Sequence, residues 1–309
     1  MVSREHPSWL TQKIPDFSVF PRIKGLLDTV SLHTVCEAAQ CPNQGECFAC
    51  GTATLLIMGT ICTRNCTFCA ISKGHPLPLD PNEPQHVSRA VTSLGLKHVV
   101  ITSVTRDDLP DCGAGHFART VAAIRQGNPG VTIEVLIPDF QGNVGLLNMV
   151  VESSPDVIGH NVETVPSLYP DVRPKADYDR SLAILRAVKA RNQNIVTKSG
   201  FMLGLGERHD QVLPVMKDLR SAGCDCLTIG HYLSPSPQHH RVMRYITPSE
   251  FQEYRLTGEE MGFGFVASAP FVRSSFKAEE MYRSIAAKQR TDSNNFREFT
   301  VDQLSSRMG

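Results

Sequence analysis

Three cysteines within eight residues are the strongest chemical signal in the chain. Cys62, Cys66 and Cys69 lie in CTRNCTFC with the spacing C-x3-C-x2-C. Structural zinc sites and simple ferredoxins normally use four protein ligands, so three thiolates would leave one metal position open for another molecule. The three positions could also lie on one face of a helix as buried apolar side chains. Because the intervening Thr, Arg and Asn residues favour turns over helix interiors, the spacing predicts a metal-binding loop.

A second group of cysteines comes earlier in the chain. CEAAQCPNQGEC places Cys36, Cys41 and Cys47 at the spacing C-x4-C-x5-C, and the proline, asparagine and glycine within it indicate a loop. Two hypotheses fit this spacing equally. The group could form a structural zinc site completed by Cys50, or it could hold a second iron–sulfur cluster with its fourth ligand elsewhere.

The composition is typical of a globular enzyme. The 309 residues are 41% hydrophobic and 20% charged, which suits one large domain or two smaller ones. Basic and acidic residues balance at 31 each, so the net charge favours neither a nucleic-acid partner nor a membrane surface. No apolar stretch approaches the roughly 20 residues of a membrane span, and the N-terminus has no apolar signal region. We therefore expect a cytoplasmic protein in which the clustered cysteines, among ten in all, bind metal and do not form disulfides.

Buried strands and amphipathic helices alternate after residue 50. Strands are predicted at 53–59, 98–104, 132–138, 156–162, 195–203 and 226–233, and helices at 116–127, 178–192 and 209–223. This alternation indicates repeated βα units and a parallel sheet. About six units can be counted, fewer than the eight of a closed barrel. The preferred α/β fold is therefore a partial, open (β/α)6-type TIM barrel, and a doubly wound open sheet is the alternative.

Both architectures place chemistry at the carboxyl ends of the strands. CTRNCTFC directly follows the first predicted strand, so its cysteines are expected on that face. We divide the chain into an N-terminal extension (1–50) carrying the second cysteine group, a barrel (51–270) and a C-terminal extension (271–309). The last part is predicted to contain a helix at 277–290 and then a polar tail.

The two cysteine groups together resemble lipoyl synthases, which are radical S-adenosylmethionine enzymes. The resemblance covers roughly residues 8–280 and continues in order through GTATLLIMG, TSVTRDDLPDCGAGHFA, HNVETVPSLYPDVRPKADYDRSL, KSGFMLGLGE, LTIGHYLSPSPQHHRVMRYITPSEF and FVRSSF. The C-x3-C-x2-C motif alone would indicate only the superfamily. The C-x4-C-x5-C group and the Arg-Ser-Ser element are far more specific.

The resemblance implies two 4Fe–4S clusters. The ligands of the first cluster, whose open iron would bind S-adenosylmethionine, would be Cys62, Cys66 and Cys69. The ligands of the auxiliary cluster would be Cys36, Cys41, Cys47 and Ser275. A serine alkoxide binds iron less strongly than a thiolate, which suits a cluster that must be taken apart. The tyrosine of the family motif is Phe276 here, and we expect Ser275 to remain a ligand because its own oxygen makes the bond.

The implied reaction attaches sulfur to unactivated alkyl carbons, for which acid–base catalysis offers no route. In the family, the first cluster donates an electron to S-adenosylmethionine, and the resulting 5′-deoxyadenosyl radical removes hydrogen from carbon 6 of an octanoyl chain on a carrier-protein lysine. The carbon radical attacks a sulfide of the auxiliary cluster, and a second S-adenosylmethionine repeats the step at carbon 8. Both clusters must then flank one apolar cavity at the top of the barrel.

Five further polar residues are candidate cofactor contacts: Asn161, Glu163, Arg173, Lys198 and Arg273. The first two follow the fourth predicted strand and are expected to contact S-adenosylmethionine, or else to cap the next helix near Pro166. Arg173 and Lys198 could meet carboxylates or be ordinary charges. Arg273 is expected to position the serine pair.

The resemblance also implies partners. These are octanoylated lipoyl-carrier proteins or domains (glycine cleavage H protein or 2-oxoacid dehydrogenase E2 type), an electron donor such as ferredoxin or flavodoxin, and an iron–sulfur carrier that rebuilds the auxiliary cluster. We expect a monomer that binds neither nucleic acid nor membrane.

Two rival functions remain open at this stage. One is another radical S-adenosylmethionine sulfur-inserting enzyme, of the biotin synthase or methylthiotransferase type. The other is a protein without catalytic activity, either a two-cluster electron carrier or a zinc-stapled binding protein. Metal analysis distinguishes the zinc-stapled binding protein from the cluster proteins. Zinc would indicate the binding protein, and iron with an equal amount of sulfide would indicate a cluster protein.

Overall fold

A computed structural model of the chain describes residues 7–11, 25, 32–38, 41, 43 and 54–288. Cys47, Cys50 and the predicted polar tail lie outside these residues, so the roles predicted for them stay predictions. The division of the chain into three parts also stays a prediction.

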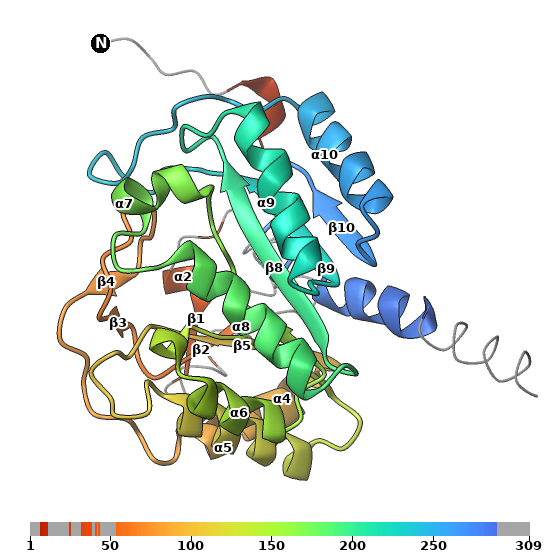
Figure 1. The fold of residues 1–309 in the computed structure, drawn as a ribbon. Helices are drawn as coiled ribbons and strands as arrows, with labels where there is room; N and C mark the ends of the chain where they lie inside the picture. The colour runs from red at the N-terminus through yellow and green to blue at the C-terminus, as the bar shows by residue number, and fades with distance from the viewer. Residues whose placement is uncertain are drawn as a thin grey trace, which may run out of the picture.

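An open, mostly parallel sheet forms the centre of the molecule (Figure 1). Its order is β1-β2-β5-β6-β7-β8-β9-β10. The strands are β1 (His33–Thr34), β2 (Thr54–Ile57), β5 (His98–Ser103), β6 (Thr132–Leu136), β7 (Val157–Gly159), β8 (Val196–Leu203), β9 (Cys226–His231) and β10 (Phe265–Ser268). Only β1 runs antiparallel to its neighbour, and the described sheet is open because β1 and β10 form its two edges. A short parallel pair, β3 (Ile61–Cys62) with β4 (Ser72–Lys73), lies apart from it.

Helices connect the parallel strands and cover the outer side of the curved sheet (Figure 1). They are α4 (Glu83–Leu94), α5 (Ala114–Gly127), α6 (Val144–Glu152), α8 (Tyr178–Arg191), α9 (His209–Ser221) and α10 (Pro248–Glu260). Two four-residue helices lie in other connections: α2 (Val35–Ala38) between β1 and β2, and α7 (Tyr169–Val172) before α8. Three short 3-10 turns are η1 (Ser8–Leu10), η3 (Phe140–Gly142) and η4 (Pro166–Leu168). Residues 278–288 form a further helix.

Local sequence signals set the helix ends. Thr247 and Glu250 form a capping box at the start of α10, in which each side chain accepts the other residue's backbone N–H. The predicted stop of α9 at Gly223 is confirmed, since the helix ends at Ser221, Ala222 is its C-cap, and Gly223 then takes a left-handed conformation (φ 82°).

The strands have two different faces. Ile133 and Val135 of β6 pack into the core beneath the outer helices. Glu134 and Leu136 point to the inner face, because successive side chains of a strand alternate. At the carboxyl end of this inner face Leu136 lines a cavity, whereas deeper in the barrel Glu134 pairs with Lys198 and His98. The inner face therefore changes from a charged lower layer to a cavity at the top.

The helix at 278–288 closes the amino end of the sheet. Its Met281 and Ile285 pack with Val157, Val196 and Cys226, the first residues of β7, β8 and β9. The helix predicted at 277–290 is thus present from residue 278 to the last described residue, 288. Chemistry is left to the opposite, carboxyl end of the strands.

The predicted fold class, a partial and open barrel, is confirmed. All six predicted strands are present, but a further parallel strand, β10, was not predicted. Its four residues are mostly half-exposed and follow Gly262 and Gly264, so they show no continuous apolar run. Among the described residues, no helix has the length and apolar character needed to cross a bilayer.

Candidate functional site

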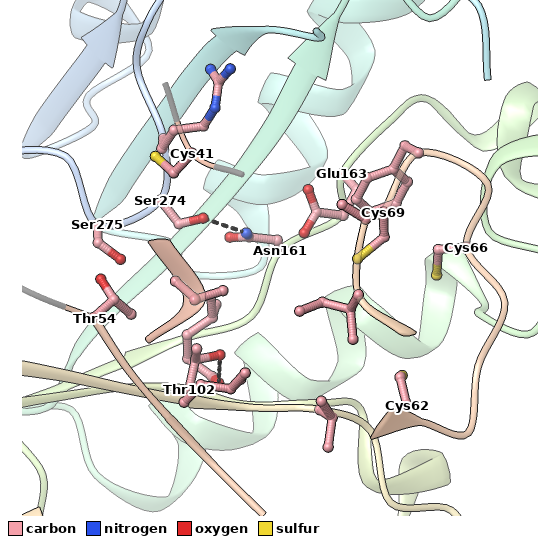
Figure 2. Close-up of a pocket in the computed structure, with 18 of the residues that line it drawn as sticks. Cys41, Thr54, Cys62, Cys66, Cys69, Thr102, Asn161, Glu163, Ser274 and Ser275 are labelled. Carbon is pink, nitrogen blue, oxygen red and sulfur yellow. Dashed lines mark hydrogen bonds between the residues drawn. The ribbon is translucent and has the colours of Figure 1, made fainter. Parts of the chain in front are cut away.

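A cavity of about 540 Å³ opens at the carboxyl ends of the parallel strands (Figure 2). Each of these strands contributes wall residues, from its own end or from the loop that follows it. Residues from the N-terminal extension, including Cys36 and Cys41, complete the wall. Chain segments that are far apart in the sequence therefore meet around one space.

The CTRNCTFC segment forms one side of the cavity. Cys62 ends β3, whereas Cys66 and Cys69 lie in the irregular loop after it, so the predicted loop is confirmed over the helix. The Cys62 sulfur accepts backbone N–H bonds from Arg64 and Thr105, each 3.4 Å long. Such bonds favour a negatively charged sulfur, as a metal ligand requires.

Burial dominates the electrostatics of the other two thiols. It raises the pKa of Cys66, and it raises the pKa of Cys69 to about 12. Both side chains are thus protonated at neutral pH without a metal. Binding a metal would release their protons.

Arg64, between the first two cysteines, clamps the loop to the barrel. Its guanidinium is 6% exposed and bonds two carboxylates. It meets Asp107 at 2.8 and 3.0 Å, and Asp139 at 2.9 and 2.5 Å. Burial alone would raise the pKa of Asp139, but the hydrogen bonds and charge of Arg64 hold it well below its usual range. The two acids follow β5 and β6, so one side chain fixes the loop across two strand ends.

A second set of polar contacts fixes where the loop begins. Met58 follows β2 in the left-handed region (φ 66°), outside the pairing of the sheet. Its N–H donates to Glu83 at 2.9 Å and its carbonyl accepts from Arg106 at 3.3 Å. Glu83 in turn contacts the buried His116 ring at 2.7 Å. Side chains thus satisfy both backbone groups at the turn that directs the chain to Cys62.

The opposite side of the cavity holds Cys36, Cys41, Ser274 and Ser275. Figure 2 shows Cys41 and the two serines across the space from Cys66 and Cys69. Cys36 lies in α2, where burial raises its pKa to about 11, and its carbonyl accepts from Cys41 N–H at 2.9 Å. The structure therefore gathers the described members of the predicted auxiliary ligand set at one end of the cavity. Cys47 lies outside the described residues.

Asn161 and Glu163 lie between the two sides (Figure 2). The side-chain Nδ2 of Asn161 donates to the Ser274 hydroxyl at 2.8 Å, and its side-chain Oδ1 is buried without a partner among the described residues. Burial raises the pKa of Glu163, and the nearby Arg173 partly opposes this shift. The alternative role of Asn161 and Glu163, capping the helix that begins near Pro166, is wrong. The N-cap of that helix, η4, is Val165, which makes no side-chain capping bond.

The two predicted arginines both line the cavity. Arg173 donates to the carbonyls of Asn161 and Val162 at 3.1 Å and lies over the Tyr169 ring, 5.4 Å from its centre. Arg273 bonds the carbonyl of Val272 at 2.7 Å, on the auxiliary side. Arg173 is therefore close enough to Cys66 for a charge interaction with its thiol, and Arg273 has the same kind of interaction with Cys41.

The structure does not place Lys198 where the predicted cofactor contact would need it. Its side chain is 2% exposed and is not part of the cavity wall. It forms a 2.8 Å ion pair with Glu134, which also contacts His98 at 3.3 Å. Lys198 lies too deep in the barrel because its strand, β8, continues five residues beyond it before reaching the carboxyl end.

His160 and Phe276 also form part of the wall. His160 directly precedes the predicted Asn161, but sequence reasoning did not single it out. Its Nδ1 meets the Ile137 carbonyl at 2.9 Å, and its buried Nε2 has no partner among the described residues. Burial lowers the pKa of His160 to about 4, so the ring is neutral and Nε2 can accept a hydrogen bond. Its place directly after a strand was the signal that could have found it.

The donor set suits clusters better than single ions. Within the described residues, no three His, Cys, Asp or Glu side chains converge closely enough to hold one metal ion. A 4Fe–4S cluster bonds each ligand to a different iron, so its thiolates can be spread around a wider space. Three thiols on one side of the cavity, and two thiols with two serine hydroxyls on the other, fit this requirement.

Comparison with known proteins agrees with this site. The family model of the Radical SAM superfamily matches residues 56–219, which include the CTRNCTFC loop. The fold is similar to the crystal structure of HydG, a maturase of the [FeFe]-hydrogenase (TM-score 0.55, 14% identity, 75% of this chain and 55% of that one). Fold and site thus define a radical S-adenosylmethionine enzyme.

Sequence relatives give the family within this class. The chain is 56% identical over 273 residues to the lipoyl synthase of Caldanaerobacter subterraneus subsp. tengcongensis, covering 88% of this chain and 95% of the relative. It is 53% identical over 277 residues to the lipoyl synthase of Alkaliphilus metalliredigens, covering 90% and 96%. The chain belongs to the lipoyl synthase family and is a radical S-adenosylmethionine sulfurtransferase. Membership implies a 4Fe–4S cluster and S-adenosylmethionine.

Proposed function

We propose that this enzyme inserts two sulfur atoms, at carbons 6 and 8 of an octanoyl chain carried on a protein lysine, and that it uses two clusters to do so. The observation that supports the proposal is that two separate groups of Cys and Ser side chains, the candidate cluster ligands, lie on opposite sides of one cavity (Figure 2). An electron carrier would need no such space between its clusters.

Each side of the cavity has its own ligands. The first cluster would be held by Cys62, Cys66 and Cys69, and the auxiliary cluster by Cys36, Cys41, Cys47 and Ser275. When bound, the first cluster would supply the electron that splits S-adenosylmethionine into methionine and a hydrogen-abstracting 5′-deoxyadenosyl radical, and the auxiliary cluster would supply the sulfide.

The polar residues between the two sides would bind and orient S-adenosylmethionine. Glu163 offers a carboxylate to its amino group, and Arg173 offers a cation to its carboxylate. Asn161 and His160 line the same cavity, and the side-chain Oδ1 of Asn161 and Nε2 of His160 are buried acceptors without a partner among the described residues. Since burial makes a polar atom without a partner costly, each of these atoms gains from meeting a ligand hydrogen.

The rest of the wall would hold the acyl chain and exclude water. It includes the apolar side chains of Leu56, Val104, Leu136, Met202 and Phe276. A reactive carbon radical needs such surroundings, because a closed apolar site keeps out water and dissolved molecules that would cause side reactions.

The proposed partners follow from this chemistry. The substrate would be an octanoylated lipoyl-carrier protein or domain, which inserts its acylated lysine into the cavity. A low-potential donor such as ferredoxin or flavodoxin would supply electrons, and an iron–sulfur carrier would replace the consumed auxiliary cluster. These reactions suit the cytoplasm, where thiols stay reduced.

An anaerobic assay tests the proposal. The protein is reconstituted with iron and sulfide, then mixed with reductant, S-adenosylmethionine and a peptide bearing octanoyl-lysine, and the peptide is followed by mass spectrometry. We expect a gain of two sulfur atoms. Formation of 5′-deoxyadenosine without sulfur on the peptide would contradict either the proposed substrate or the proposed role of the auxiliary cluster. Absence of both products in protein of verified iron content would support an electron carrier instead.

A further inference from the structure

The segment that carries the serine pair follows β10 and has no regular structure, yet its path is closely determined. The Pro270 carbonyl accepts from His231 N–H at 3.1 Å, and Val272 N–H donates to the Ala269 carbonyl at 3.1 Å. The segment therefore leaves the sheet in a tight turn against the end of β9.

Gly230 of β9 makes this close approach possible. A Cβ atom at residue 230 would overlap the carbonyl oxygen of Val272 and also crowd the Arg273 guanidinium. A glycine inside a strand often marks such a close approach of another backbone. The position of the segment from Val272 onward thus depends on the missing side chain at residue 230.

The other contact comes from the far end of the sequence. Asn43 lies between the second and third cysteines of CEAAQCPNQGEC, and it is 2% exposed. Its Nδ2 donates to the Phe271 carbonyl at 2.6 Å, across 228 residues of chain. This bond joins the loop of the auxiliary cysteines directly to the turn that leads to Ser275.

We propose that Asn43 is a positioning residue for the serine ligand, holding the turn at Phe271 so that Ser275 faces Cys36 and Cys41. The proposal rests on the auxiliary cluster of the proposed function. It adds that the ligand set, which comes from both ends of the chain, is kept together by a side chain that is not itself a ligand.

The arrangement has a consequence for turnover. Asn43 holds a backbone carbonyl and Asn161 holds the Ser274 hydroxyl, so neither bond uses Ser275. Ser275 would therefore be able to release an auxiliary cluster, or to bind a new one, while these two contacts keep the segment beside the cavity.

Asn43→Asp is the sharpest test, because it keeps the shape of the side chain but replaces the N–H donor by an acceptor that the Phe271 carbonyl repels. Asn194→Asp makes the same chemical change at an exposed site away from the cavity and serves as the control. Both are made in full-length protein that lacks the first-cluster thiols, so that all bound iron reports on the auxiliary cluster.

The readouts are the rate at which a chelator removes this iron and the hydrogen exchange of backbone amides in residues 269–277. We expect Asn43→Asp to lose iron about tenfold faster than its parent, because repulsion replaces the hydrogen bond to the Phe271 carbonyl, and we expect faster amide exchange in the segment. Ser275→Ala should lose iron equally fast without the change in exchange. Equal rates for Asn43→Asp and Asn194→Asp would overturn the proposal.

Gly230→Ala provides a second test that leaves Asn43 intact, and it is decisive if Asn43→Asp does not fold. It displaces the same segment from the β9 side, so it should also speed iron loss. Unchanged iron loss in this variant would contradict the proposal. Neither iron loss nor amide exchange requires catalytic turnover. If the wild-type protein inserted no sulfur, the proposed function would be contradicted, but this test of Asn43 could still be carried out.

Discussion

The two ligand regions of the cavity are built in different ways. The first is one short loop, Cys62–Cys69, held by Arg64 against the ends of β5 and β6 and by side chains around Met58 at its start. The second joins residues near 36–43 to residues 271–275, and its segments meet through contacts such as the bond from Asn43 to Phe271. The first is local in sequence, and the second exists only in the folded chain.

This difference matches the tasks that we propose for the two regions. A cluster that binds S-adenosylmethionine in every cycle benefits from a rigid loop, whose ligands are fixed by the barrel. A cluster that loses sulfide and is rebuilt needs a ligand that can leave and return. Placing the serine on a separate, tethered segment allows this without unfolding the cysteine loop.

The largest expected effect is that of Cys66→Ala in the first region. Removing one of three thiolates should prevent S-adenosylmethionine cleavage, so that 5′-deoxyadenosine and lipoyl product both fall by at least about a hundredfold. Chromatography of the nucleoside measures the first loss. Persistent 5′-deoxyadenosine would contradict the assignment of the loop.

Cys41→Ala should separate the two regions. We expect 5′-deoxyadenosine to form within about threefold of the wild-type amount, because the first cluster is intact, while sulfur insertion is lost. Mass spectrometry of the peptide in the same reaction gives both values. Full lipoyl formation by this variant would show that the second region is structural.

Arg64→Met tests how the first loop is held. Breaking this buried ion pair leaves Asp139 with only its 3.3 Å ion-pair contact to Arg180, and should lower the free energy of unfolding by up to about 3–5 kcal/mol, which denaturant titration measures. Iron should be lost from the first cluster before the auxiliary one. Arg208→Met, which breaks an exposed pair with Asp210, is the matched control and should change neither stability nor iron content. Equal behaviour of the two variants would contradict the clamp.

The smallest expected effect concerns pH. The pKa of Asp139 is lowered in the folded state, so its ionisation stabilises the fold above its ordinary pKa of about 4, and this contribution fades as pH falls below that value. The difference in unfolding free energy between wild type and Asp139→Asn should therefore be largest near neutral pH and shrink in acid. Metal-free protein, unfolded with urea at several pH values, provides the measurement. A difference that grows in acid would contradict the role of Arg64.

Periodicity predicted most of the fold, because parallel strands buried on both faces give continuous apolar runs. β10 was missed because it is short and half-exposed at a sheet edge, and its pairing with β9 defines it more than its own residues do. The cysteine loop was predictable since its ligands are neighbours in sequence.

The rest of the site depends on depth and long-range contact, which a sequence does not show. Asn161 follows β7 and lines the cavity. Lys198 belongs to the neighbouring strand β8, but it lies below the cavity and pairs with Glu134. Ser275 was predicted only through the family resemblance, and nothing in CPNQGEC indicates that Asn43 bonds a carbonyl 228 residues away.

The most direct test of the central claim is to follow the sulfur. The auxiliary cluster is built with heavy-isotope sulfide, free sulfide is removed, and the enzyme is mixed with reductant, S-adenosylmethionine and the octanoyl-lysine peptide. The account predicts one lipoyl product per chain, with both sulfur atoms carrying the heavy isotope, and none from Cys41→Ala. Product with light sulfur, or labelled product from Cys41→Ala, would contradict the claim that the second region is the sulfur source.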